Sequence, residues 1–520
     1  MITKWLITMS LSIFLLTGLS TSSFFLSDLL TRVIEEGEHN TRQFNFALAQ
    51  GNEAALFYAL QQSKKGSQNW QELAKKLARH NGNVAYLLAE FYLNNDYLDE
   101  RFISQSEQAT FWYQQAIRLN YPKASIALAD LYFHQGNILA AQNLLAKSPV
   151  MELLPHQRDG VAVDAVILRI KIAISIGDIE LANSLLIKFS SFIKTNKTGY
   201  LLLNAIKKYQ VLSLADYENI NSDNNAVTCP NSIQFFATNL RQLAHVERVV
   251  KHFRNKPLND LVCFSSVRYL PFSTLSCSSE LEKPIICDET KLHKVADSVS
   301  TRYIAIMLPE GGANVHFGIL YFDAQDSIDV VAHEISHLLG FVDEYPLVKG
   351  HVKCRSSQQQ VSAQNIAVLQ NSYQGERNVI REKILRQLAW SEQIKKSTPI
   401  LQLKNEYWQL GTPEQFEQEV GLFRSETCDN NSAEQQRIFN AFKPISARTK
   451  LQYEELNFPQ QYIALLHENS EQFLMPSFHY NIALAYYQIN NIEQASHWLE
   501  KAVGWENNSR RQKKIRQGDF

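Results

Sequence analysis

Up to about residue 225 the chain places apolar residues at helical spacing, with short breaks at Gly and Asn. Between 226 and 430 prolines and cysteines appear, and short β-rich runs replace the helical period. Helical spacing returns between 431 and 520. The pattern predicts a multidomain protein, in which an α-solenoid of helix pairs at 24–225 precedes an α+β domain at 226–430 and a C-terminal helical region at 431–520.

The helical parts repeat themselves. Leu88–Tyr92 recurs as Leu128–Tyr132, an offset of 40, and Gly136-Asn137-Ile138 recurs as Gly177-Asp178-Ile179, an offset of 41. Repeats of this length, with small residues at helix crossings, are typical of stacked helix pairs. The same spacing returns near the C-terminus and predicts one further helix pair there, at Ala483, Tyr486, Asn491-Ile492 and Ala495.

One stretch of the first helical part carries a family resemblance. Ala109, Trp112-Tyr113-Gln114-Gln115-Ala116, Tyr121 and Ala124 resemble the second helix and following turn of Sel1-like repeats, a variety of the tetratricopeptide family. The resemblance implies helical surfaces that bind a protein partner or pack against a neighbouring domain. We expect the repeated tyrosines to lie in the cores between helices, namely Tyr92, Tyr132 and Tyr486.

The central domain combines strands with one long helix. Arg302–Leu308 is predicted to be a strand that ends at a proline, and Asn314–Phe322 a second strand. A helix is then predicted to begin near Ser327, capped by Asp326 or Ser327, and to end at Gly340.

Two histidines and a glutamate on this helix form a candidate metal site. His333 and His337 are four residues apart, so one helical turn places both imidazoles on one face, able to ligate one Zn²⁺. Glu334 can take a proton from a zinc-activated water and later pass it to a leaving amine. Zinc would lower the pKa of that water and polarise the scissile carbonyl.

The residues after this motif supply a third candidate ligand. Gly340 can take the left-handed conformation that turns the chain back, and Asp343 follows six residues after His337. Two histidines and one carboxylate leave a fourth tetrahedral position open, which is the arrangement of a catalytic zinc site. Glu344 and His351 are the alternatives for the third ligand, and the spacing favours Asp343.

The segment from His333 to Asp343 resembles the metzincin zinc-binding motif, HExxHxxGxxH, with Asp343 in place of the third His. An Asp there is similar to snapalysin-type bacterial peptidases, and Glu344-Tyr345 is similar to the DEY ending of IgA-peptidase-like enzymes, where the spacing is one residue longer. The resemblance implies a zincin-like catalytic domain with an extended substrate beside an edge strand, here Asn314–Phe322. We assign no Met-turn, because the only downstream methionine is Met475, 132 residues beyond Asp343.

The N-terminus predicts export. Lys4 is followed by an uncharged, largely apolar stretch from Trp5 to Leu19 and then by the small residues Ser20–Ser23. This pattern is typical of a secretory signal peptide at residues 1–23. The uncharged stretch continues to Ser27, long enough to span a bilayer and act as a membrane anchor if it is not cleaved. The mature protein would be periplasmic or secreted.

The cysteines are consistent with export. Six of them lie in the middle of the chain, at Cys229, Cys263, Cys277, Cys287, Cys354 and Cys428. An exported protein would pair them as disulfides, and the spacing leaves the connectivity open.

The charge balance narrows the choice of partner. With Lys+Arg 51 against Asp+Glu 52, the chain has no net positive charge that would attract phosphate backbones, so we expect no nucleic-acid partner.

We predict an exported zinc metallopeptidase, an endopeptidase rather than an exopeptidase, that acts on a peptide or protein substrate. A protein partner would bind the repeats. The alternative is a repeat-based envelope scaffold whose zinc domain is structural or inactive, but a structural site needs no general base such as Glu334.

Overall fold

The computed structural model describes residues 25–94, 102–147, 160–211, 229–278, 283–469 and 471–518. The chain forms two compact units, one of Met1–Ile172 with Phe189–Tyr200 and the other of Ala173–Lys188 with Leu201–Phe520. The predicted signal peptide lies outside the described residues. Within the ranges given above, no helix has both the length and the apolar character needed to cross a membrane.

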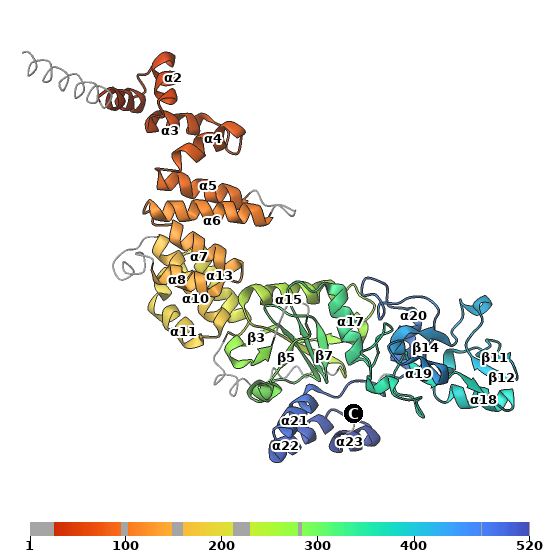
Figure 1. Ribbon diagram of the computed structural model, residues 1–520. Helices are drawn as coiled ribbons and strands as arrows, with labels where there is room; N and C mark the ends of the chain where they lie inside the picture. The colour runs from red at the N-terminus through yellow and green to blue at the C-terminus, as the bar shows by residue number, and fades with distance from the viewer. Residues whose placement is uncertain are drawn as a thin grey trace, which may run out of the picture. The chain divides into compact units, whose positions relative to one another are not determined.

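The first unit consists of short helices that pack against their neighbours in sequence (Figure 1). They include α2 (Thr41–Ala49), α3 (Glu53–Gln62), α4 (Gln68–Leu77), α5 (Gly82–Asn94), α6 (Phe102–Arg118), α7 (Ala124–His134), α8 (Ile138–Ala146) and α12 (Ser190–Thr195), together with the first part of α10 (Gly160–Ile176). Ala85 and Ala89 of α5 and Ala109 and Ala116 of α6 are fully buried, so the two helices approach closely. This packing fits the helical repeats that the sequence predicts.

The repeated Gly-Asn/Asp-Ile motif marks a turn between two helices. Gly136 and Gly177 have positive φ angles of 80° and 81°. The residues that follow them, Asn137 and Asp178, each accept a hydrogen bond from the main-chain N–H three positions on. Asn491 caps its helix in the same way near the C-terminus. The repeat therefore encodes a left-handed residue followed by a helix cap.

The second unit is centred on a sheet with strand order β2-β1-β6-β8-β7, and β3 also pairs with β1. The strands are β1 (Ser232–Ala237), β2 (Cys263–Phe264), β3 (Arg268–Tyr269), β6 (Tyr303–Met307), β7 (Asn314–His316) and β8 (Ile319–Phe322). All pairs are parallel except β7 with β8, which is antiparallel and places β7 at the edge. Strand β6, predicted from the sequence, is central and buried along its length, as expected when helices cover both faces.

The stretch 314–322 is not the single strand that the sequence predicts. A tight turn at Phe317 and Gly318, with φ angles of 37° and 82°, divides it into β7 and β8. Two adjacent residues with positive φ are what a two-residue hairpin loop of type I′ requires. A Cβ added at Gly318 would lie 2.5 Å from the main-chain nitrogen of Phe478, so only glycine fits this turn.

The two faces of the sheet contact different helices (Figure 1). Phe236, Ile304 and Tyr321 share a buried cluster with Phe478 and Trp498. These last two residues belong to α21 (Phe478–Gln488) and α22 (Ile492–Val503), whereas α15 (Leu240–Phe253) and α17 (Ile328–Leu338) pack on the other side. The C-terminal helix pair predicted from the repeat is therefore present, and it forms part of the core of this unit.

The remaining sheets of this unit are small. Their strands are β4 (Cys277–Ser278), β5 (Ile286–Cys287), β9 (Ala367–Gln370), β10 (Ser372–Tyr373), β11 (Leu401–Lys404), β12 (Tyr407–Leu410), β13 (Phe423–Ser425) and β14 (Phe439–Lys443). Their orders are β4-β5, β10-β12-β11 and β13-β14-β9, so residues on both sides of position 430 share the last sheet. The other helices are α11 (Ile179–Lys188), α13 (Lys197–Lys208), α16 (His293–Ala296), α18 (Arg377–Leu385), α19 (Ala433–Ile438), α20 (Gln460–Glu468) and α23 (Ser509–Arg516).

All six cysteines are paired, as the sequence predicts. The disulfides are Cys229–Cys263, Cys277–Cys287 and Cys354–Cys428. All three lie in the second unit.

Candidate metal centre

Helix α17 carries the two candidate histidine ligands. It begins after Ser327, whose hydroxyl accepts hydrogen bonds from the main-chain N–H groups of Asp329 and Val330 at 3.2 Å each. Of the two predicted caps, the structure therefore uses Ser327. Apolar side chains at helical spacing bury the helix against the sheet, which holds its polar residues in a fixed orientation.

Gly340 turns the chain back after α17, as predicted. Its φ angle is 92°, which favours glycine. A Cβ at this position would lie 2.2 Å from the main-chain oxygen of Phe473. The turn thus requires glycine for two reasons: its backbone conformation, and the close approach of another segment.

The structure brings together the four residues that the sequence selects. The Nε2 atoms of His333 and His337 are 3.1 Å apart, and Asp343 Oδ1 is 3.1 Å from each of them. Ligand atoms of His333, Glu334 and His337 lie within 4.8 Å of one another. His333 is 1% exposed and Glu334 is 8% exposed, whereas the side chains of His337 and Asp343 are 12% and 17% exposed, so the site is largely buried but still reached by solvent.

The other ring nitrogen of each histidine is bound to a main-chain oxygen. His333 Nδ1 lies 2.9 Å from the carbonyl oxygen of Lys450, and His337 Nδ1 lies 3.1 Å from that of Phe341. A carbonyl can only accept, so Nδ1 carries a proton in each ring, and Nε2 faces the site, where it offers a lone pair whenever the ring is neutral. Asp343 Oδ1 is buried, and no residue in the described part of the chain donates a hydrogen bond to it.

Three acceptor atoms that face one another at 3.1 Å need a cation or protons to hold them together. The centre of a triangle with such edges is about 1.8 Å from each corner, close to the distance of about 2.0–2.2 Å that zinc keeps from nitrogen and oxygen ligands. Two imidazoles and one carboxylate are ligands that zinc accepts, and a tetrahedral zinc with these three would accept a fourth ligand. The residues present therefore fit a zinc ion.

Burial and charge shift the pKa values of the site residues. Burial by itself disfavours the imidazolium, but the carboxylate of Asp343 outweighs it and raises the pKa of His337 to about 10. Burial would raise the pKa of Asp343, yet the two histidines hold it well below its usual range. Burial raises the pKa of Glu334, although the charges of His337 and His333 oppose the shift. Glu334 is thus a stronger base than an exposed glutamate.

Glu344, an alternative third ligand, is bound by other residues of the loop's surroundings. It is fully buried, and both of its carboxylate oxygens are hydrogen-bonded. Its partners are Asn365, Lys443, Thr449 and Tyr462. The geometry therefore favours Asp343 as the third ligand, and Glu344 anchors the loop that carries it.

Two further residues of this loop were singled out from the sequence. The Tyr345 ring stacks on that of His333, with centroids 6.3 Å apart and planes at 13°. Burial and the neighbouring Asp343 carboxylate raise the pKa of the Tyr345 hydroxyl. His351, the other alternative ligand, accepts a hydrogen bond from the Lys353 main-chain N–H at its Nδ1, at 3.3 Å. Tyr345 thus borders the site, and His351 caps a short helix instead.

Several contacts to the site come from distant segments that sequence reasoning did not find. Lys450 binds His333 through its carbonyl oxygen, which no residue type could have indicated. Thr427 donates from its hydroxyl to the main-chain oxygen of Asp343 at 2.8 Å. The main-chain N–H of Met475 donates to the carbonyl of Leu338 at 2.9 Å. The downstream methionine thus lies next to the end of the motif helix, despite its distance in sequence.

Comparison with known proteins bears on the C-terminal helices. Residues 476–509 match the family model of the tetratricopeptide repeat. This range contains α21 and α22, so the match agrees with the helix pair predicted from the sequence repeat. No curated protein matches the chain. A tetratricopeptide repeat is consistent with a protein partner.

Proposed function

We propose that the chain is an exported zinc-dependent peptidase of metzincin type. The observation that carries the proposal is the close triangle of His333 Nε2, His337 Nε2 and Asp343 Oδ1 beside the buried Glu334. His333, His337 and Asp343 would hold the zinc. Main-chain carbonyls at Lys450 and Phe341 support this assignment, because they orient both rings with their lone pairs toward the site.

Zinc, when bound, would supply a Lewis acid that activates water at neutral pH and polarises the scissile carbonyl. Glu334 is the proton carrier of the proposed reaction. Its raised pKa favours taking up a proton at its carboxylate, and the more basic leaving amine would later accept that proton. Tyr345 lies at the rim of the site with its ring nearly parallel to that of His333, and the neighbouring Asp343 carboxylate helps to keep its hydroxyl protonated.

A peptide substrate would extend along β7, the edge strand of the sheet, by pairing with its main chain. Parts of this edge already have partners. The N–H of Gly312 donates to the carbonyl of Lys283 at 2.7 Å, and Asn481 Nδ2 donates to the carbonyl of His316 at 2.8 Å. The Asn314 side chain also exchanges hydrogen bonds with the main chain of Ile285, at 2.9 and 3.2 Å, so a peptide would have to pair with the main-chain groups of β7 that these contacts leave open.

Export is part of the proposal. Its support is the signal-peptide pattern of the first 23 residues and the pairing of all six cysteines, which persists in oxidising compartments. The second candidate is a scaffold that uses the same zinc site for structure. The tetratricopeptide match and the helices of the first unit favour it. A buried glutamate beside the ligands favours the enzyme instead.

The test is the zinc content of the purified protein beside its cleavage of a broad peptide library, with and without a chelator. We expect about one zinc per chain, and cleavage that the chelator abolishes. His333→Ala and His337→Ala should each lose the zinc while circular dichroism shows a folded chain. Normal zinc content in both variants would refute the metal site. Bound zinc without any cleavage would favour the scaffold.

A further inference from the structure

The third candidate ligand differs from the other two in what holds it. His333 and His337 are fixed by one helix, whereas Asp343 follows the helix in a loop. A loop residue keeps a ligand geometry only if other parts of the chain hold its backbone. The segment that does so here is 425–431, and it arrives from more than 80 positions further along the chain.

Thr427 is the centre of this contact. It is fully buried, and its hydroxyl donates to the carbonyl of Asp343 at 2.8 Å. Its own carbonyl accepts from the main-chain N–H of Leu347 at 2.9 Å. Ser425, two residues earlier, donates from its hydroxyl to the carbonyl of Glu344 at 3.3 Å. The two segments are thus hydrogen-bonded at several successive positions of the loop.

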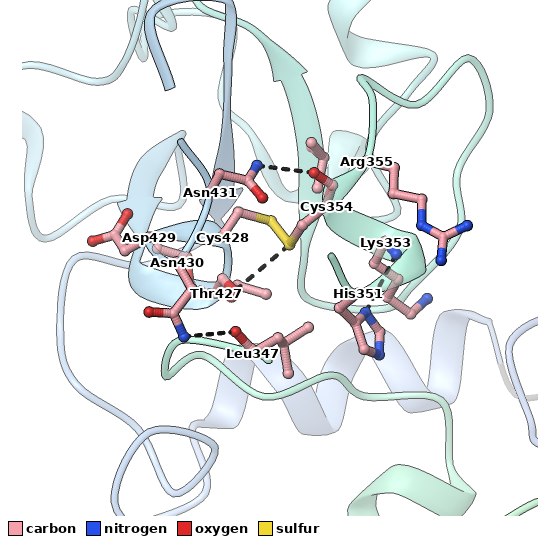
Figure 2. The surroundings of a disulfide bond; sticks show 12 residues. Leu347, His351, Lys353, Cys354, Arg355, Thr427, Cys428, Asp429, Asn430 and Asn431 are labelled. Carbon is pink, nitrogen blue, oxygen red and sulfur yellow. Dashed lines mark hydrogen bonds between the residues drawn. A yellow bond between two sulfur atoms is a disulfide. The ribbon is translucent and has the colours of Figure 1, made fainter. Parts of the chain in front are cut away.

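A disulfide closes the same contact covalently (Figure 2). Cys428 adjoins Thr427 and is bonded to Cys354, at the far end of the loop that begins with Asp343. Cys354 Sγ lies 3.6 Å from the Thr427 carbonyl oxygen, and Asn431 Nδ2 donates to the Cys354 carbonyl at 2.9 Å. The bond keeps Thr427 opposite the loop and prevents the two segments from separating.

We propose that Thr427, held in place by the Cys354–Cys428 disulfide, is a positioning residue that sets Asp343 for metal binding. The inference rests on the proposed function, because it assigns a role toward the same zinc site. It makes metal affinity depend on one hydroxyl and one disulfide that touch no ligand atom. Outer contacts of this kind change metal affinity by about 10–100-fold in other metal sites.

The first test is Thr427→Val, which keeps the shape of the side chain and removes the hydroxyl. Zinc affinity is measured by competition with a chromophoric chelator, and the absorption spectrum of the cobalt-substituted protein reports the ligand geometry. We expect about 10-fold weaker zinc binding and an altered cobalt spectrum. Thr427→Ser retains the hydroxyl and should restore both.

Thr301→Val is the matched control for this variant. Thr301 is also buried, and it also donates to a main-chain carbonyl, that of Tyr303 at 2.8 Å. Its loss should leave the cobalt spectrum and the zinc affinity unchanged. Equal affinity and equal spectra in wild type and Thr427→Val would overturn the positioning role while the zinc site itself stands. A wild-type protein that binds neither metal would overturn this inference together with the proposed function.

The disulfide is tested by Cys354→Ala/Cys428→Ala against Cys277→Ala/Cys287→Ala, with both proteins shown to be folded by circular dichroism. The second pair joins β4 and β5, away from the Asp343 loop. We expect zinc affinity to fall by about 10–100-fold in the first variant and to stay unchanged in the second. An equal loss in both variants, or no loss in the first, would contradict the inference.

Discussion

His333 Nδ1 binds the carbonyl oxygen of Lys450 at 2.9 Å, although 117 positions separate the two residues. The Lys450 side chain also contacts α17, the helix that carries His333, because its Nζ lies 2.8 Å from Asp329 Oδ1. One residue therefore orients a candidate ligand and anchors the helix that carries it. The candidate site consequently depends on a segment that lies well beyond the motif in sequence.

Loss of the Glu344 carboxylate should destabilise the second unit. Lys443 Nζ lies 2.8 Å from Glu344 Oε2, and both side chains are buried. Glu344→Ala would leave the ammonium group unpaired in the interior, so the free energy of unfolding in urea should fall by about 3–5 kcal/mol. Glu500→Ala breaks a pair with Arg516 that is exposed to solvent, and it should have little effect. Equal effects of both substitutions would contradict the structure of this network.

Zinc affinity should keep increasing as the pH rises past neutrality. In the metal-free protein the pKa of His337 is raised to about 10, so a proton occupies the ring at pH 7 and must leave before a metal binds. Below the pKa of His337, protons compete with zinc for the ring more strongly as the pH falls. Above that pKa the ring is neutral and this competition ends. Chelator competition from about pH 6 to pH 9 should show a continuous rise, whereas an ordinary histidine with a pKa of about 6.5 would level off earlier. A plateau above about pH 7.5 would contradict the coupling between His337 and Asp343.

How far the sequence predicts the fold can be judged from two stretches. The helix that bears the motif was predictable because Ser327 caps it and Gly340 ends it, and both signals are local. The hairpin at Phe317 and Gly318 was missed because apolar residues continue through the turn. Phe317 also takes a positive φ that its residue type does not favour.

The residues of the candidate site also fall into those that the sequence predicts and those that it does not. His333, Glu334, His337 and Asp343 were found by their spacing, because one helical turn and one glycine turn bring them together. The residues that support them act through main-chain carbonyls or single hydroxyls from remote segments. Contacts of that kind leave no pattern of residue types along the chain, so only the folded structure reveals them.

The C-terminal helix pair should unfold together with the sheet it covers. Trp498 is 2% exposed and packs in the cluster that includes Phe236 and Ile304. Trp498→Ala should lower the free energy of unfolding by about 3–5 kcal/mol. The urea concentration at which zinc is released and the midpoint of the loss of circular dichroism signal should both fall, and by the same amount. Tyr487→Ala, at a position 64% exposed, is the control and should shift neither. Loss of helix signal without zinc release would indicate a separate module.

The purified mature protein should begin near residues 21 to 24 and contain no free thiol. The small residues Ser20–Ser23 mark the expected cleavage site, and all six cysteines are paired. N-terminal sequencing and thiol titration of the unfolded, non-reduced protein measure these features. Six reactive thiols or a cytoplasmic location would contradict export.

The central claim is that Glu334 carries protons for peptide hydrolysis at a zinc site. The direct measurement is the turnover of a cleaved peptide by wild type and Glu334→Gln, each with its zinc content determined. The substitution removes the base and keeps the ligands His333, His337 and Asp343. We predict equal zinc content and at least about a hundredfold slower turnover in the variant. Equal turnover by the two proteins would contradict the account.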